Sequence, residues 1–269
     1  METLIQVSPA DPERLPPQVD YALALTAALR GRVTALVFEV DTLAGEEEEE
    51  AERESRGETT AIQIATREAL AARAEAARVE ADIITGRNYA FTILETLGDY
   101  ARLSDLVVVE TDGPLVFPRR HLAEYTLFDT GRPVLLVPGH AQFSLERVVV
   151  AWDASRAATR ALHDAMPLLQ AASEVVVVTI GEGEDAPAGR SGVELCRRLA
   201  HRGVSAQFTA LDREGRPAGA CLMEFCSETG ADMLVMGAQR HSRLRDLVYG
   251  SATNTVFDQG PRLPVFLAN

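Results

Sequence analysis

Short apolar runs alternate with segments of helical periodicity along the whole chain. In the second half, the unbroken apolar run 147–152 is followed by apolar positions at helical spacing over 158–169, and this alternation continues to the run 264–268. An unbroken apolar run of this length is typical of a strand that is covered on both faces. The pattern therefore predicts the order β-α-β-α-β-α-β-α-β, and with it a parallel sheet that has helices on both faces.

The same order occurs twice, which predicts a tandem duplication. In the first half we expect strands at 4–7, 33–40, 80–85, 106–109 and 134–137, with helices at 21–29, from about residue 59, and at 91–103. In the second half we expect strands at 147–152, 175–180, 204–211, 232–236 and 264–268, with helices at 158–169, 192–203 and 217–229. The predicted fold class is α/β, with two tandem five-stranded parallel sheets in domains 1–140 and 145–269.

The two halves are expected to pack together as an intrachain pseudo-dimer. Their final strands, 134–137 and 264–268, are apolar, and each would otherwise be an open edge of its sheet. Exposed edges invite pairing with another strand. We therefore expect the two edges to come together.

Composition narrows the class of function. The 269 residues suit two domains of ordinary size, and 46% of them are hydrophobic, which is typical of a globular chain. The formal net charge of −14 argues against non-specific binding to nucleic acid or to an anionic membrane surface. No apolar run is long enough to span a bilayer, and no secretory signal is expected. The three cysteines match no metal or disulfide pattern, so we expect reduced thiols, no bound metal and a cytoplasmic protein.

The segment after the predicted strand 232–236 is suited to phosphates. Gly237 leaves the strand, a basic loop follows, and Gly250-Ser251 opens a helix-like stretch at 252–257. Glycine lets backbone N–H groups approach a ligand closely, and a helix N-terminus favours negative charge. The segment resembles the nucleotide loop of the universal stress protein family, in which Gly, two residues, Gly, nine residues and Gly-Ser or Gly-Thr follow in order. The chain departs from this pattern at one position, because Arg240 stands where the family has its second glycine.

The resemblance implies further site residues. Asp153 follows the first strand of the second half, where nucleotide-binding members of the family place an aspartate against the adenine of ATP or AMP. Asp153 is equally suited to cap the helix that follows, as is Ser155. Gly237 fits either a ligand approach or a tight turn. Arg240 either fills the phosphate pocket or contacts the phosphates, and His241 is a weaker phosphate candidate.

The first half lacks this constellation, so we interpret it as a structural partner. No aspartate directly follows its first strand, and His121-Leu122 stands at the counterpart of Gly250-Ser251. The acidic stretch 46–58 has no counterpart in the other half and is interpreted as a solvated helix start.

The predicted function is that of a cytoplasmic, non-catalytic stress-response protein that binds ATP or AMP in its second half. The resemblance also implies a homodimer as a further assembly. Two alternatives stay open: an enzyme of the adenine-nucleotide α-hydrolase type, and an assembly scaffold without a ligand. The enzyme alternative would carry a Ser-Gly-Gly-x-Asp-Ser type loop after its first strand, where this chain has Asp153-Ala154-Ser155.

Overall fold

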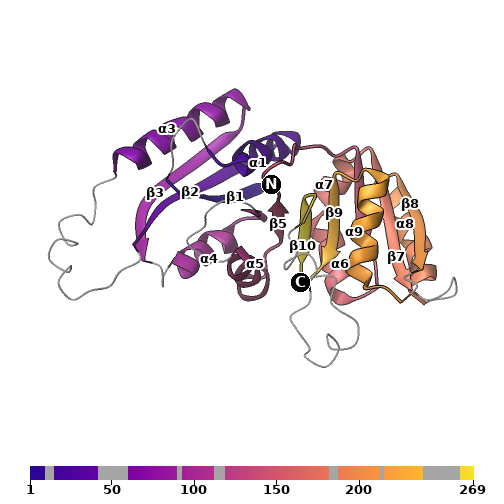
Figure 1. Ribbon diagram of the computed structural model, residues 1–269. Helices are drawn as coiled ribbons and strands as arrows, with labels where there is room; N and C mark the ends of the chain where they lie inside the picture. The colour runs from indigo at the N-terminus through magenta and orange to yellow at the C-terminus, as the bar shows by residue number, and fades with distance from the viewer. Residues whose placement is uncertain are drawn as a thin grey trace.

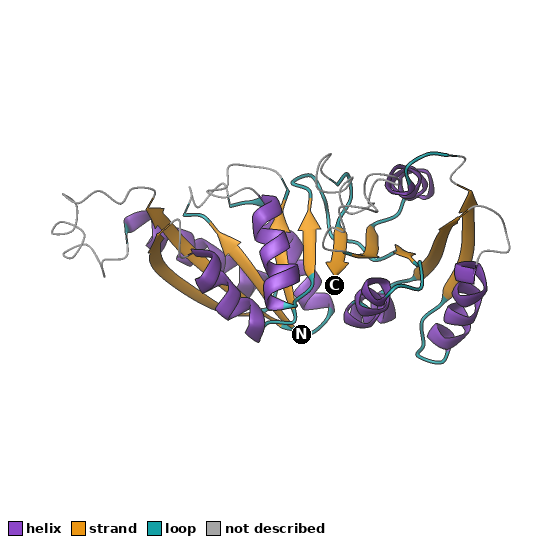
Figure 2. Cartoon of the chain, turned by 90° about the horizontal axis from the view of Figure 1, so that it is seen from below, coloured by secondary structure: helices purple, strands orange, loops and turns teal. Residues whose placement is uncertain are grey.

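The computed structural model describes residues 1–9, 15–41, 60–89, 93–111, 119–181, 187–212, 215–238 and 261–269. The acidic stretch 46–58 and the helix-like stretch 252–257 lie outside these ranges. Within them the chain folds as one ten-stranded sheet with helices on both faces (Figures 1 and 2). The α/β class that the periodicity predicted is confirmed.

The two halves present the same order of elements. The first half contains β1 (Glu2–Val7), α1 (Pro17–Ala28), β2 (Arg32–Asp41), α3 (Ala61–Ala76), β3 (Glu80–Tyr89), α4 (Ile93–Leu103), β4 (Leu106–Glu110), α5 (Arg119–Tyr125), the π-helix η2 (Thr126–Thr130) and β5 (Val134–Val137). The second half contains β6 (Arg147–Ala151), α6 (Arg156–Asp164), α7 (Met166–Ala171), β7 (Glu174–Gly181), α8 (Pro187–Ala200), β8 (Ala206–Asp212), α9 (Ala218–Thr229), β9 (Met233–Gly237) and β10 (Val265–Ala268).

The strand order joins the two halves at the centre of the sheet. It runs β3-β2-β1-β4-β5-β10-β9-β6-β7-β8, and every neighbouring pair is parallel except β5 and β10. These two strands pair antiparallel, with Phe266 opposite Leu135. The two apolar edges that the sequence leaves open therefore cover each other.

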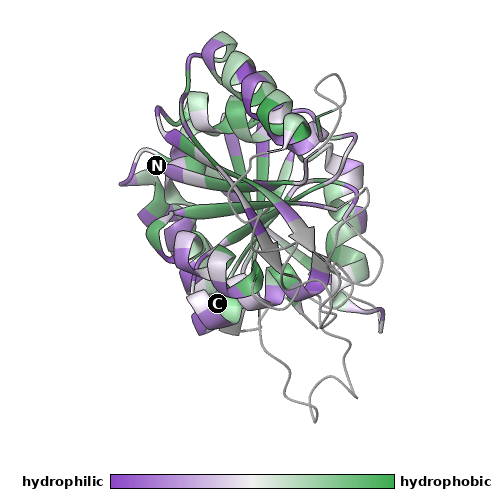
Figure 3. Ribbon diagram, turned by 90° about the vertical axis from the view of Figure 1, so that its left-hand side faces the viewer, coloured by the Kyte–Doolittle hydropathy of each residue, from purple (hydrophilic) through white to green (hydrophobic). Residues whose placement is uncertain are grey.

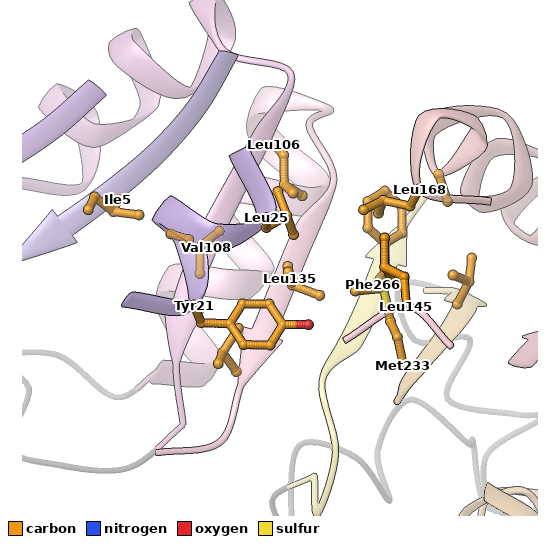
Figure 4. Close-up of a cluster of buried hydrophobic side chains, with 14 of the residues drawn as sticks. Ile5, Tyr21, Leu25, Leu106, Val108, Leu135, Leu145, Leu168, Met233 and Phe266 are labelled. Carbon is orange, nitrogen blue, oxygen red and sulfur yellow. The ribbon is translucent and has the colours of Figure 1, made fainter. Parts of the chain in front are cut away.

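The hydrophobic core continues across this junction on both faces of the sheet. One cluster lies under α1, α3, α6, α7 and α8, and the other under α4, α5, η2 and α9. Each cluster contains strand residues from both halves. Figure 3 shows the hydrophobic strands enclosed by helices that carry polar residues on the outside. At the junction Tyr21 extends from α1 toward the second half (Figure 4). Its ring packs edge-on against Phe143, with the ring centroids 5.5 Å apart.

Two equivalent hydrogen bonds, each from a backbone N–H to an aspartate side chain, show which residues of the two halves correspond. Glu2 N donates to Asp105 Oδ2 at 2.7 Å, and in the second half Arg147 N donates to Asp232 Oδ2 at 2.8 Å. The strand that follows each of these aspartates has five residues, β4 in one half and β9 in the other. Glu110, the last residue of β4, is therefore the counterpart of Gly237, the last residue of β9.

Several elements differ from the prediction, and α1 and α8 each begin four or five residues earlier than expected. The single helix expected at 158–169 is two helices, α6 and α7, which meet at Ala165. Pro167 explains the break, because proline donates no N–H and its ring clashes with the preceding turn. Strand β3 continues beyond the predicted range to Tyr89. Finally, α5 and η2 occupy 119–130, where the predicted order includes a helix but the periodicity gave no bounds for it.

Candidate functional site

The candidate site of the second half lies at the carboxyl ends of β6 and β9. Strand β6 pairs with β7 on one side and with β9 on the other, so consecutive connections leave the centre of this half in opposite directions. In open α/β sheets a ligand crevice forms where the strand order reverses in this way. Asp153 follows β6 and Gly237 ends β9, so the structure brings these two predicted residues to one point of the sheet edge.

The loop between β6 and α6 shows which residue caps the helix. Ser155 is the N-cap of α6, and its Oγ accepts a hydrogen bond from Ala158 N at 3.1 Å. Asp153 instead accepts from Ser155 N through Oδ1 at 2.9 Å, and the residue between them, Ala154, has a left-handed backbone with φ of 58°. A left-handed alanine costs roughly 1 kcal/mol. Because the side chain of Ser155, and not that of Asp153, bonds the first turn of α6, the cap interpretation of Asp153 is wrong.

One carboxylate oxygen of Asp153, Oδ2, accepts no hydrogen bond from the described residues. Asp153 is exposed. The turn to Ser155 holds Oδ1 and thereby orients the carboxylate. Asp153 is therefore an oriented acceptor at the carboxyl edge of the sheet, directly after β6.

Gly237 is required by helix packing. A Cβ added there would lie 2.5 Å from Ala158 N and 2.6 Å from the carbonyl carbon of Ala157. These distances are far inside van der Waals contact, so the first turn of α6 approaches β9 as closely as it does only because residue 237 lacks a side chain. Its φ is not in the left-handed region, and a tight turn is therefore not the reason for glycine. Neither interpretation made from the sequence anticipated this contact.

Trp152 is a site residue that the sequence interpretation missed. Its backbone N donates to Val178 O at 2.8 Å, and its indole Nε1 donates to Ser191 Oγ at 2.8 Å. Its carbonyl accepts from the buried Thr179 hydroxyl at 2.9 Å. Trp152 thus ties the carboxyl ends of β6 and β7 to helix α8 and fixes the loop that carries Asp153. The signal in the sequence is a lone tryptophan directly before the aspartate.

The other predicted site residues, Arg240, His241, Gly250 and Ser251, lie outside the described residues. For them the sequence pattern stays a prediction.

The matching position of the first half carries different chemistry. Glu110, largely buried, stands where the second half has Gly237. Gln18, the second residue of α1, stands where α6 has Ala157, and it is 3% exposed. Its Nε2 donates to Gln6 O at 3.1 Å, while its Oε1 has no partner in the described part of the chain. Two small residues of the second half are thus replaced by a carboxylate and an amide.

None of the three cysteines forms a disulfide. Cys221 and Cys226 are buried, and Cys196 is half-buried. Burial raises the pKa of the Cys226 thiol to about 12, so it stays protonated at neutral pH. Across the described ranges no group of His, Cys, Asp and Glu side chains is placed to hold a metal ion. In the same ranges no helix combines the length and apolar character needed to cross a membrane.

These features define a tandem, doubly wound α/β protein with its candidate site at the carboxyl edge of the second half. The sequence of residues 144–266 matches the model of the universal stress protein family. Residues 144–266 are therefore a universal stress protein domain. A search of curated proteins gives no match.

Solved structures share the fold over nearly the whole chain. A universal stress protein from Archaeoglobus fulgidus DSM 4304 superposes with a TM-score of 0.75 at 16% identity, covering 100% of this chain and 98% of its own. A putative universal stress protein from Pseudomonas aeruginosa UCBPP-PA14 gives 0.61 at 15% identity, with coverages of 99% and 92%. The cytoplasmic domain of a prokaryotic cation chloride cotransporter gives 0.54 at 12% identity, with coverages of 99% and 94%. At these identities the likeness shows the fold alone.

Proposed function

We propose that this protein is a non-catalytic, cytoplasmic stress-response protein that binds one adenine nucleotide, ATP or AMP, in its second half. The observation that carries the proposal is the position of Asp153. Its oriented carboxylate lies at the switch point of the sheet beside Gly237, and one of its oxygens has no partner among the described residues. A carboxylate so placed accepts a hydrogen bond from the exocyclic amine of adenine.

The phosphate end of the proposed site rests on the sequence pattern. Gly237 leads directly into the basic loop, and Gly250-Ser251 has the spacing of a phosphate-binding helix start. Arg240, at the position of the family's second glycine, fills the space under the phosphates and lowers affinity for a triphosphate.

Replacing it in the variant Arg240→Gly should therefore strengthen ATP binding, and a ten-fold weakening would make the arginine a ligand instead.

The first half is proposed to bind no nucleotide, because it lacks the residues of the proposed site. No aspartate directly follows its first strand, and Glu110 stands at the counterpart of Gly237. The first half is therefore proposed to contribute the partner sheet and no ligand.

The competing functions are separated by one experiment. The purified protein is denatured and the released small molecules are identified by mass spectrometry, while added ATP is followed for turnover in a parallel sample. Released ATP or AMP without turnover supports the proposal. Rapid turnover would favour the α-hydrolase type of enzyme. The absence of any nucleotide, together with no ATP binding at millimolar concentration, would favour the scaffold, a role consistent with the use of this fold in a transporter's cytoplasmic domain.

A further inference from the structure

We infer that the second half carries another ligand site, for a small organic carboxylate, in the helix layer between α6/α7 and α8. A cavity of about 290 Å³ lies there, apart from the carboxyl edge of the sheet. Its apolar surface is formed by Leu162, Met166, Leu195 and Leu199. Pockets that bind small molecules usually measure roughly 300–1,000 Å³, so this cavity suits a small ligand with an apolar body.

Every titratable side chain that lines the cavity is basic. These side chains are His163, Arg198, His201 and Arg202. The whole chain has 40 acidic residues and 26 lysines and arginines. A cavity lining without a carboxylate is therefore not what this composition would lead one to expect. The local charge therefore favours an anionic ligand.

Two carboxylates lie near this lining, and both have partners. Glu194 forms ion pairs with Arg198 at 3.2 Å and with Arg197 at 3.5 Å, and all three side chains are largely exposed. An exposed pair of this kind is weak, so it leaves Arg198 available to a second anion. Asp164 forms an ion pair with Arg160 at 3.2 Å, although its buried Oδ2 accepts no hydrogen bond within the described residues.

The first half shows what the second half lacks. Its helices α1 and α3 are joined by Arg73, whose NH1 donates to both carboxylate oxygens of Asp20 at 3.0 Å. Arg73 precedes Ala74, which bonds Val79 N, just as Arg198 precedes Leu199, which bonds Val204 N. Arg198 is therefore the counterpart of Arg73. Arg198 lines the cavity, while Thr159, at the counterpart of Asp20, offers it no carboxylate. An external carboxylate bound in the cavity would supply such a charge.

The test follows the methionine methyl signals of the whole protein by NMR, with 2-naphthoate as the probe and the uncharged 2-naphthamide as its isostere. The sequence has five methionines, and of these only Met166 lines the cavity. On titration with 2-naphthoate the Met166 methyl should shift and saturate, while those of Met223, Met233 and Met236 stay in place. The amide should bind at least ten-fold more weakly, because it lacks the charge.

Matched variants locate the anion contact. Arg198→Gln and Arg202→Gln should each weaken 2-naphthoate binding several-fold. Arg197→Gln is the control, since Arg197 is adjacent on the same helix, shares the Glu194 partner and does not line the cavity. Met166→Trp should fill the cavity and abolish binding.

Four results would overturn the inference. Three of them are a Met166 signal that does not move at millimolar 2-naphthoate, equal affinity for the acid and the amide, and equal loss in Arg197→Gln and Arg198→Gln. Competition by ATP for the Met166 shift would also overturn it, because the cavity would then belong to nucleotide binding.

Discussion

At the scale of single residues, Gly237 combines two roles. The first turn of α6 packs against the backbone of Gly237, so packing alone requires glycine at this position, whether or not a ligand binds. The same residue is the first glycine of the sequence pattern that we propose to bind the phosphates. The family pattern and the packing requirement therefore select the same residue for different reasons.

The variant Gly237→Ala should destabilise the protein by roughly 1–3 kcal/mol, because the added methyl group forces α6 away from the sheet. Chemical denaturation followed by circular dichroism measures this. Gly86→Ala is the control. There a Cβ would meet only the Phe38 ring, at 3.3 Å, and a side chain shifts more easily than a helix backbone. Equal stability of Gly237→Ala and the wild type would contradict the packing role.

Tyr21 carries a buried hydroxyl without a partner in the described part of the chain. Its removal in Tyr21→Phe keeps the edge-on contact with Phe143 and relieves an unmet hydrogen-bonding group. The variant should be as stable as the wild type, or more stable by about 1 kcal/mol, at neutral pH. A loss of more than 1 kcal/mol would show that the hydroxyl has a partner after all.

The same residue predicts a pH effect. Burial, with the charge of Asp232 adding to it, raises the pKa of Tyr21 above its ordinary value. Above pH ~10 the unfolded chain loses this proton while the folded chain keeps it, so folding stability falls as pH rises. The advantage of Tyr21→Phe over the wild type should therefore grow between pH 9 and pH 11 in denaturation curves. A constant difference would contradict the assignment.

Residue roles were harder to predict from the sequence than residue positions. Asp153 was placed correctly after its strand, yet whether it or Ser155 caps α6 depends on loop geometry that two adjacent good capping residues leave open. Glu110 was not recognised as the counterpart of Gly237, since that match appears only in the hydrogen bonds of the two aspartates that precede the strands. Trp152 was interpreted only as the last residue of a strand. Its indole hydrogen bond joins it to Ser191, which is 39 residues away in the sequence, so local patterns do not reveal it.

At the scale of elements, the repeated strands were the most predictable part of the fold. Strands such as β5 and β6 are continuous apolar runs bounded by polar or proline residues, and their structural bounds agree with the prediction to within a residue. The bounds of α5 and η2 could not be predicted, because the sequence from Arg119 to Thr130 mixes polar and apolar residues without a clear period. The break after α6 was likewise hidden by apolar spacing that continues through Pro167.

The pairing of β5 with β10 predicts that the halves depend on each other. Residues 1–140 and 145–269, expressed separately, should be poorly soluble alone and should associate when mixed or co-expressed, because each otherwise exposes an apolar strand edge. Phe266→Ala in the second segment should weaken this association, since Phe266 lies opposite Leu135. Phe208→Ala, on the distant strand β8, is the control. Two soluble monomers that do not interact would contradict this prediction.

At the scale of the whole molecule, duplication has produced two halves with one framework and different chemistry. The strand-start aspartates Asp105 and Asp232 are retained in both halves, while the carboxyl edges have diverged. One edge has Asp153 and Gly237, and the other has Gln18 and Glu110. In our account the first half retains the sheet and the junction, and the proposed nucleotide site remains in the second half alone.

The central claim is tested most directly by calorimetric titration of the full chain with ATP. We predict a stoichiometry of one ATP per chain and a loss of affinity of about ten-fold or more in Asp153→Ala, as expected for a hydrogen bond to a charged group worth roughly 1.5–3 kcal/mol. Asp82→Asn, at an exposed aspartate of β3 in the first half, should bind like the wild type. Two ATP per chain, no heat at millimolar ATP, or unchanged affinity in Asp153→Ala would contradict the account.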